Sequence, residues 1–394
     1  MDSLALASGG ETMASLLETP LSEAGSFDIL SLISTASPGA VNFFTETVLK
    51  QLDRFESVEA RIAVTGESVG GRSSFIDAIR NVPDNEAGAC PAGGSVTEPT
   101  NYKFPSTNAL QIWDLPAIGS PDFSAAEYLD HVAFHRFDAF LILSSDRFTE
   151  NELLLAKAIQ KRQKNVYLVR MESASDPLLP GGEQREASPN DGLKEQLPKV
   201  FLVTSWRPGS LGFEELLLDL AQDLSELKKR AFLFAVPCVT SKIEQAKKEL
   251  MMNEIWKVAA RPILVNMMPI PVLSDMCGMT QLVATLTSYR KAFGLDEDSR
   301  GRWAKRVGRK PEEFSSAVTS TFGLAVCVSA VKKQIAKAAQ SGRILATLLN
   351  VVPVVGQMGS ATLSYRHTLS MLEAAVGEMA QDSERLLQKV LPLK

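Results

Sequence analysis

Cysteine and histidine are scarce in this sequence, which has four cysteines and three histidines among 394 residues. The cysteines show no Cys-x-x-Cys spacing; they are Cys90, Cys238, Cys277 and Cys327. Zinc sites and disulfide frameworks need such side chains in clusters. The sequence therefore argues against both, and we expect reduced thiols in a cytoplasmic protein.

An excess of positive charge is also missing. Lysine and arginine number 41 against 46 aspartates and glutamates, which gives a formal net charge of −5. Proteins that bind nucleic acid usually carry a basic surface. We therefore expect no nucleic acid among the partners.

No apolar run is long enough to cross a membrane, which takes about 20 residues. The two longest candidates, Pro262–Val272 and Ile344–Gly356, each contain asparagine and proline. The N-terminus has no basic segment followed by an apolar one, and Asp2 stands where N-myristoylation requires glycine. The sequence predicts no signal peptide, no transmembrane span and no N-myristoylation.

What is present is a globular composition, with 45% hydrophobic and 22% charged residues. The length of the chain implies two or three domains. We expect a mobile N-terminal segment (1–25), an N-terminal helical arm (26–56), an α/β domain (57–230) and a C-terminal helical domain (231–394).

Apolar runs alternate with helical patterns between residues 57 and 230. The runs that predict strands are Ile62–Val64, Ala109–Trp113, Ala139–Leu143, Asn165–Arg170 and Val200–Thr204. The segments between them that predict helices are Ser73–Asn81, Glu150–Lys164 and Phe213–Lys228. This alternation is typical of an α/β fold with a doubly wound, mostly parallel sheet, whose ligands bind at the carboxyl ends of the strands.

After about residue 232 the strand patterns stop and helical periodicity takes over. The predicted helices are Thr240–Ala260, Ser274–Phe293, Gly301–Gly308, Pro311–Ser329, Val331–Leu349 and Ser360–Leu391. The C-terminal part is therefore expected to be all-α.

A glycine-rich turn connects the first predicted strand to the first predicted helix. It matches the phosphate-binding loop Gly-x-x-x-x-Gly-Lys-Ser/Thr at every fixed position except the lysine. The glycines let backbone N–H groups surround phosphate oxygens, and the helix start adds partial positive charge. The predicted phosphate-binding residues are Gly66, Glu67, Ser68, Val69, Gly70, Gly71, Arg72, Ser73 and Ser74.

Arg72 stands where this loop normally has lysine. The lysine is a compact point charge, whereas arginine is longer and planar, so the exchange is not conservative. Two interpretations stay open: Arg72 still holds phosphate, as arginine does elsewhere, or it is an exposed side chain beside an empty loop. The sequence predicts a nucleoside triphosphatase with an altered part.

Together with this loop, Trp113-Asp114-Leu115-Pro116-Ala117-Ile118-Gly119 carries a specific likeness. The chain resembles the immunity-related (interferon-inducible) GTPases, whose pattern here is Trp-Asp-Leu-Pro-Gly-Ile-Gly. Further agreement lies in Ile62–Glu67, Ser73–Ile76 and Tyr289–Asp296, so the likeness extends from about residue 28 to the C-terminus. It implies a Ras-like P-loop domain combined with an all-α domain built from N- and C-terminal segments.

The resemblance also assigns magnesium and switch positions. Ser73, Thr97 and Asp114 are the implied Mg²⁺ ligands, with Thr100 as the second choice to Thr97. Ala117 replaces the glycine whose backbone meets the γ-phosphate. A Cβ at that position restricts the backbone, so γ-phosphate sensing is expected to be impaired.

The base-reading residues depart furthest from the family. Its Thr-Lys-Val-Asp motif corresponds here to Met171, Glu172, Ser173 and Ala174, so the aspartate that accepts from guanine is missing. A two-residue slip would offer Asp176 instead. The last base-contacting loop corresponds to Thr204 and Ser205.

Three departures in one site favour a quasi-GTPase, a weak or non-hydrolysing GTP-binding scaffold or regulator in cell-autonomous defence or autophagy-linked membrane processes. The expected cofactors are GTP or GDP, whose binding is weak or lost, and Mg²⁺. The alternative is a working GTPase of interferon-induced immunity at intracellular membranes. The partners implied are related GTPases or a second copy of this chain.

Two further contacts remain hypotheses. Phe27 and Leu30 fit the aromatic-x-x-aliphatic peptides that bind ubiquitin-like autophagy modifiers. A helix within Thr240–Gly278, with Lys247, Lys248, Lys257 and Arg261, is compatible with peripheral binding to intracellular membranes. It is equally compatible with a core helix.

Overall fold

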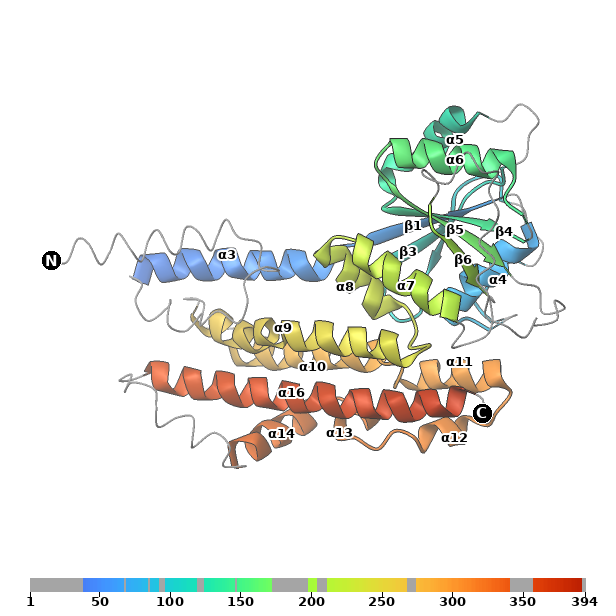
Figure 1. Cartoon of the computed structure of the whole chain (residues 1–394). Coiled ribbons are helices and arrows are strands. Elements are labelled where there is room, and N and C mark those ends of the chain that lie inside the picture. Colours follow the sequence, from blue (N-terminus) through green and yellow to red (C-terminus); the bar gives the residue numbers. More distant parts are fainter. Residues whose placement is uncertain are drawn as a thin grey trace. The chain divides into compact units, whose positions relative to one another are not determined.

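The computed structural model describes residues 38–66, 69–83, 86–91, 96–118, 124–145, 147–171, 198–203, 211–267, 274–340 and 357–391. The chain (Figure 1) divides into two compact units. The sheet unit comprises residues 59–244, 297–316 and 384–394, and the helical unit comprises residues 1–58, 245–296 and 317–383. The sheet unit thus includes three segments that the sequence layout placed in the C-terminal helical domain: 231–244, 297–316 and 384–394.

The sheet unit is built on six strands in the order β2-β3-β1-β4-β5-β6. All neighbouring strands are parallel except β2 and β3, which are antiparallel. The strands are β1 (Ala60–Thr65), β2 (Thr100–Lys103), β3 (Leu110–Asp114), β4 (Ala139–Ser144), β5 (Asn165–Met171) and β6 (Val200–Val203). The expected α/β fold with a mostly parallel sheet is confirmed.

Strand β2 is the one element of the sheet that the sequence did not predict. Its four residues, Thr-Asn-Tyr-Lys, have no apolar run and are too short to show a period of two. The strand forms because it pairs with β3 at the sheet edge, which sets Thr100 opposite Asp114.

The two faces of the sheet are covered by different helices. Alternate residues of the central strands, such as Ala63, Phe140 and Ile142, join a core cluster that includes residues of α5 (Ala125–His131) and α6 (Glu150–Lys161). Figure 1 shows α5 and α6 together over this face, with α4, α7 and α8 toward the other. Because helices cover both faces of the sheet, a ligand can reach the strands at their carboxyl ends, where the connecting segments begin.

On the opposite face, α4 (Val69–Arg80) and α7 (Leu211–Asp223) meet through the Phe75 and Phe213 rings, whose centroids lie 6.2 Å apart. The sequence predicted one helix over Phe213–Lys228, and this was wrong. Ser225 takes an extended ψ of 152° and starts a new helix, α8 (Glu226–Ala235). The described helices that complete this unit are η1 (Phe134–Arg136), α11 (Glu297–Val307) and α12 (Pro311–Ser315).

The helical unit has no strand among its described residues. Its helices are α3 (Pro38–Ser57), α9 (Ser241–Met267), α10 (Ser274–Ala292), α13 (Thr321–Leu324), α14 (Val328–Gln340) and α16 (Gln357–Val390). The first residues of α9 and the last of α16 belong to the sheet unit. The expected helix Val331–Leu349 is described as far as Gln340.

The single helix expected over Pro311–Ser329 is instead two short helices, α12 and α13. The Ser320 side chain accepts a hydrogen bond from Gly323 N at 3.0 Å and so caps α13. The Asp382 carboxylate, which is fully buried, accepts from Ser320 N at 3.0 Å and from Thr319 N at 3.1 Å. These bonds fix the backbone in a non-helical turn before α13, and so the helix cannot run through.

Helix α3 packs with the C-terminal helices of the helical unit. Arg261 of α9 pairs with Asp53 and Glu56 of α3. Lys247, also in α9, is fully buried and donates to Ala292 O at 2.5 Å, while Lys257 is 7% exposed. Three of the four basic residues considered for membrane contact are therefore engaged inside this unit. Among the described helices, none is long and apolar enough to cross a bilayer.

Candidate functional site

The phosphate-binding type of turn lies at the carboxyl end of β1. Thr65 ends the strand and Gly66 follows with a φ of 141°, a conformation that side chains rarely adopt. A Cβ at Gly66 would lie 2.0 Å from the carbonyl oxygen of Leu143 in the neighbouring strand β4. The turn therefore requires glycine here for two independent reasons.

Helix α4 begins at Val69, so its first turn supplies the backbone amides expected of such a loop. Gly71 and Ser73 are half-buried and Ser74 is exposed. The Val69 side chain and the exposure of Gly70 lie outside the described part, as do Glu67 and Ser68 entirely. The structure thus places the strand, the turn glycine and the helix start together.

Arg72 does not point to solvent. Its side chain is 1% exposed, and Nη1 donates to the carbonyl oxygen of Gly66 at 2.8 Å. Nε lies 3.3 Å from Oδ1 of Asp114 without hydrogen-bond geometry. Of the two interpretations left open by the sequence, the exposed arginine is wrong.

Asp114 ends β3 directly beside Val64 of β1, which brings it to the same edge as the turn. Its side chain is 3% exposed. Burial raises the pKa of this carboxyl, because a charged group is poorly solvated there, and the positive charge of Arg72 works in the opposite direction. Arg72 and Asp114 together form a buried ion pair at the base of the turn.

The ion pair bears directly on the implied magnesium site. A divalent cation beside Asp114 would also meet the positive guanidinium of Arg72, which offsets the attraction that the carboxylate alone would offer. Mg²⁺ also demands close octahedral oxygen coordination, and the carboxylate meant for it faces Arg72. The residues present do not fit Mg²⁺.

The other implied magnesium ligands lie as follows. Ser73 is in the first turns of α4, and Thr97 is exposed, ahead of β2. Thr100, the second choice, is the register partner of Asp114, but its hydroxyl donates to Glu98 O at 3.0 Å. Assignment of these hydroxyls to a metal stays a prediction.

The chain after Asp114 is tied to its surroundings by a residue that the sequence did not single out. The Tyr128 hydroxyl, from α5, donates to Pro116 O at 2.8 Å and lies 2.6 Å from the hydroxyl of Thr65. Burial raises the pKa of Tyr128, so its hydroxyl stays a donor. Ala117 follows this anchored carbonyl and is not among the non-glycine residues with positive φ. No motif could have revealed Tyr128, since its role depends on where α5 packs.

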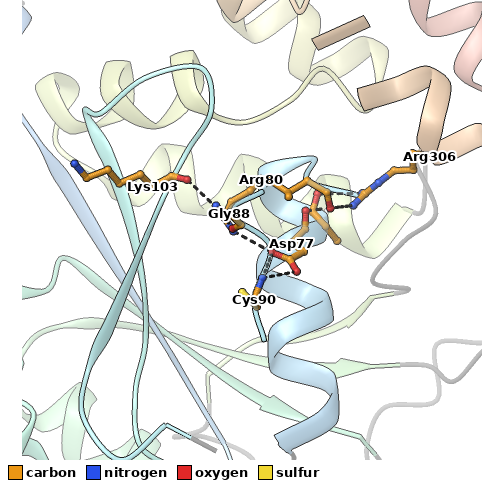
Figure 2. Close-up of polar contacts among 8 residues, drawn as sticks. Asp77, Arg80, Gly88, Cys90, Lys103 and Arg306 are labelled. Atoms are coloured by element: carbon orange, nitrogen blue, oxygen red, sulfur yellow. Dashed lines mark hydrogen bonds and ion pairs between the residues drawn. The ribbon is translucent and has the colours of Figure 1, made fainter. Parts of the chain in front are cut away.

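The connection from α4 to β2 is held by a second cluster (Figure 2). Arg80 donates to Asp77 Oδ1 at 3.0 Å, to Gly88 O at 2.9 Å and to Lys103 O at 2.9 Å. The Asp77 carboxylate also accepts from Cys90 N, at 2.9 Å from Oδ2. Two charged side chains of α4 thereby fix Gly88 and Cys90 in this connection and Lys103 at the end of β2.

Arg306 of α11 reaches the same helix end from the other side in Figure 2. It donates to the carbonyl oxygens of Val82 at 3.0 Å, Asp77 at 3.2 Å and Ala78 at 3.4 Å. Asp77 O and Ala78 O, near the end of α4, also accept from Val82 N and Asn81 N, so Arg306 adds a second hydrogen bond to each of these carbonyls. No pattern in the sequence connects residues so far apart.

We expect the two thiols at Cys90 and Cys327 to react at very different rates. Burial and the nearby Asp77 raise the pKa of Cys90 to about 12, while a hydrogen bond with Ser329 lowers the pKa of the exposed Cys327. The thiolate is the nucleophile, so near neutral pH Cys327 should alkylate roughly 1,000-fold faster or more. Peptide mass spectrometry after timed iodoacetamide exposure measures both rates.

The control for this experiment is the same protein in urea, where both cysteines should react alike. The Cys327→Ser variant should leave Cys90 protected. Comparable labelling of the two thiols in the folded protein would contradict the assigned environment of Cys90.

The base-reading positions are described only where their strands end. Met171 ends β5 and pairs with Val203, the last residue of β6, so the two following loops start side by side. Glu172, Ala174 and the alternative Asp176 lie outside the described residues. So do Thr204, Ser205, Phe27 and Leu30.

Comparison with known proteins bears on this geometry. The family model described as Interferon-inducible GTPase (IIGP) matches residues 27–178 and 189–390. Interferon-inducible GTPase 5 of Rattus norvegicus is 29% identical over 354 residues, covering 85% of this chain and 76% of that protein. Interferon-gamma-inducible GTPase 10 of Mus musculus is 27% identical over 381 residues, covering 91% and 88%.

Among solved structures, NFeoB from S. thermophilus bound to GDP.AlF4- and K+ is similar at 15% identity, with 81% of this chain and 99% of that chain covered. The TM-score is 0.28, too low to support any inference from this likeness. The family model, in contrast, matches most of the sequence, including the turn and Asp114. This chain belongs to the interferon-inducible GTPase family.

Proposed function

We propose that this chain is a family member whose nucleotide site has lost turnover, and that it works as a weakly nucleotide-binding regulator or scaffold. The single observation that carries the proposal is the buried Arg72–Asp114 ion pair. The carboxylate that would orient magnesium in a working GTPase is here neutralised by the side chain that replaced the loop lysine.

The physical argument concerns the transition state. Phosphoryl transfer is accelerated almost entirely by positioning and by charge that stabilises the transferred group, with Mg²⁺ and the loop lysine as main contributors. In this chain the lysine is absent. Arg72, which replaces it, donates to Gly66 O instead of extending toward a transferred phosphate. The anchored Pro116 and the alanine at 117 further limit the backbone that should sense a γ-phosphate.

The test is multiple-turnover release of phosphate from GTP by the full chain in magnesium buffer. Release is expected at the rate of a blank without protein. The Arg72→Lys/Ala117→Gly double variant is the matched comparison, because it restores two family residues while leaving Asp114 in place. Magnesium-dependent turnover by the unmodified chain would refute the proposal.

The second candidate is a working GTPase. It is favoured by the family assignment and by the intact Gly66, Gly71, Ser73 and Asp114. Turnover in the same assay would support this alternative. Under either function we infer that the partners are related GTPases or a second copy of this chain, since this is what the family resemblance implies.

We also expect the unmodified chain to show no preference between GTP and ATP. The acceptor that reads guanine is missing at Ala174, and contacts to phosphate carry no base information. Restoring it with Ala174→Asp should favour GTP by about 1–3 kcal/mol, the range of a charge-assisted contact. Competition of both nucleotides against a fluorescent analogue measures the preference.

Arg72→Lys serves as the control for this prediction, because it should change the affinity for both nucleotides without separating them. A strong preference for GTP in the unmodified chain would show that Asp176 serves as the acceptor. The Asp176→Ala variant should then abolish that preference.

A further inference from the structure

Positive charge gathers at the amino ends of three adjacent parallel strands, β1, β4 and β5. These strand starts share one edge of the sheet, which is the edge opposite to the turn after β1. The cations come from the second residue of β1 and from the segments directly before β4 and β5. We call their side chains the basic surface: Arg61, Arg136, Arg162 and Lys164.

The segment 134–137 brings members of this surface together. The guanidinium carbon of Arg162 lies 5.1 Å from the centroid of the Phe134 ring. Lys164 donates to Phe137 O at 2.6 Å. Cations that follow α6 are therefore held against the short segment that precedes β4.

Arg136, within that segment, is the best-ordered cation of the surface. Its guanidinium carbon lies 4.3 Å from the centroid of the Trp113 ring, and its Nε has no hydrogen-bond acceptor among the described residues. Burial lowers the pKa of Arg136, and the nearby charge of Arg61 lowers it further. A ring stacked in this way holds a guanidinium group in place while its donors stay available.

The positive charge of the surface is not balanced by the described carboxylates around it. Apart from Arg61, none of the four cations pairs with a described carboxylate, and Arg61 shares Glu59 with Gln111, each at 3.1 Å. Asp138 is already engaged by Lys228 at 2.5 Å and by the backbone N–H of Arg61 at 2.9 Å. The surface thus carries an excess of positive charge on a chain whose net charge is −5.

The chemistry of the surface favours carboxylates of a protein over a membrane. Planar guanidinium groups match carboxylates through paired hydrogen bonds, and arginine beside aromatic rings is typical of protein interfaces. A surface that binds membranes also exposes large apolar side chains. Among the described residues, none of the large exposed apolar ones lies in the segments that carry the basic surface, 59–61, 134–138 and 162–165.

We propose that the basic surface is a docking site for an acidic segment of a partner protein. The guanidinium groups and the Lys164 ammonium group supply donors for its carboxylates, and Trp113 keeps Arg136 in position. At about 3.3 Å per residue, strand β1 puts roughly 15 Å between Arg61 and the turn at Gly66. Docking therefore leaves the turn accessible, and the inference holds whether or not the chain hydrolyses GTP.

The experiment titrates fluorescently labelled decaglutamate with the full chain and follows the anisotropy. Binding is expected in about 50 mM salt and should weaken about 10-fold or more in about 300 mM salt, because salt screens attraction between exposed charges. Decaglutamine is the neutral control and should not bind. Absence of decaglutamate binding, equal binding of both peptides, or binding that salt does not change would overturn the proposal.

Charge reversal locates the docking site. Arg136→Glu/Arg162→Glu should weaken binding about 10-fold or more. Lys332→Glu/Lys333→Glu, at exposed lysines of α14, changes the net charge by the same amount and should bind as the unmodified chain does. Equal losses in the two double variants would overturn the proposal, because they would show attraction to the whole chain rather than to this surface.

Two further measurements do not depend on how the reversed variant folds. Arg162→Gln removes one charge, leaves the stacked Arg136 untouched, and should weaken binding about 3-fold with an unchanged urea midpoint. Carbodiimide joins carboxylates to neighbouring amines, so peptide mass spectrometry should find Lys164 as the main site of cross-linking to decaglutamate. Unchanged binding of the variant, or cross-links concentrated on other lysines, would overturn the proposal.

The remaining outcomes concern other ligands. Excess GDP should not displace decaglutamate, and displacement would place the peptide at the turn and overturn the proposal. Vesicles of phosphatidylcholine and phosphatidylserine test the membrane alternative by co-sedimentation. Vesicle binding that Arg136→Glu/Arg162→Glu abolishes would assign the surface to a membrane and overturn docking of a protein segment.

Discussion

Replacement of Asp114 by alanine is expected to lower the free energy of unfolding by about 3–5 kcal/mol, because it leaves a buried positive charge without its partner. Arg72 is 1% exposed, and among the described residues its only carboxylate contact is with Asp114. The guanidinium cannot release its proton, so it cannot escape the cost by becoming neutral. Urea denaturation followed by circular dichroism measures the loss.

A double variant tests whether the cost comes from the unpaired charge. Arg72→Met/Asp114→Leu replaces both charges with apolar groups, and such replacements are often neutral or stabilising. The double variant should therefore unfold at a higher urea concentration than Asp114→Ala alone. If the double variant is less stable than Asp114→Ala, the ion pair contributes more to the free energy of unfolding than its desolvation cost removes, and the unpaired charge is not the cause of the loss.

Replacement of Gly66 by alanine should have the second large effect. The new Cβ would lie 2.0 Å from Leu143 O, and φ is 141°. The unfavourable backbone alone costs of order 1–3 kcal/mol. Relief of the clash requires β1 and β4, the central strand pair of the sheet, to separate near Gly66 and Leu143. We expect a loss of more than about 3 kcal/mol by urea denaturation, the sum of strain and disturbed packing.

Gly301→Ala is the matched control for Gly66→Ala. Gly301 lies within α11, where an added Cβ meets nothing within 4 Å. Alanine is the better helix former, so stability should rise by about 0.5–1 kcal/mol. Equal effects of the two substitutions, in size or in sign, would contradict the geometry described for the turn.

Much of the sheet unit was predictable because its signals are local. Five apolar runs gave five strands, and the glycines of the turn marked the junction of β1 and α4. Asp114 could be placed beside the turn because carboxyl ends of parallel strands share an edge. The orientation of the Arg72 side chain could not be predicted in this way, because it depends on the carboxylate of Asp114, 42 positions later in the sequence.

Other parts of the site escaped prediction for the same reason. Tyr128 contributes through its distance to Pro116 and Thr65, which no spacing rule expresses. Strand β2 depends on an antiparallel partner rather than on its own residues. Arg80 and Asp77 looked like ordinary helix charges, although they hold Gly88 and Cys90 in place.

The contact between Arg306 and the end of α4 has a consequence for synthesis of the protein. The bond to Asp77 O joins residues 229 positions apart. A ribosome releases the chain from its N-terminus, so β1, α4 and the remaining strands emerge well before α11 does. Until then the hydrogen bonds of Arg306 to Asp77 O, Ala78 O and Val82 O are missing, and the nascent sheet unit cannot reach its final stability. Chains that stop before residue 297 should consequently fold less completely and depend more on chaperones than full-length ones.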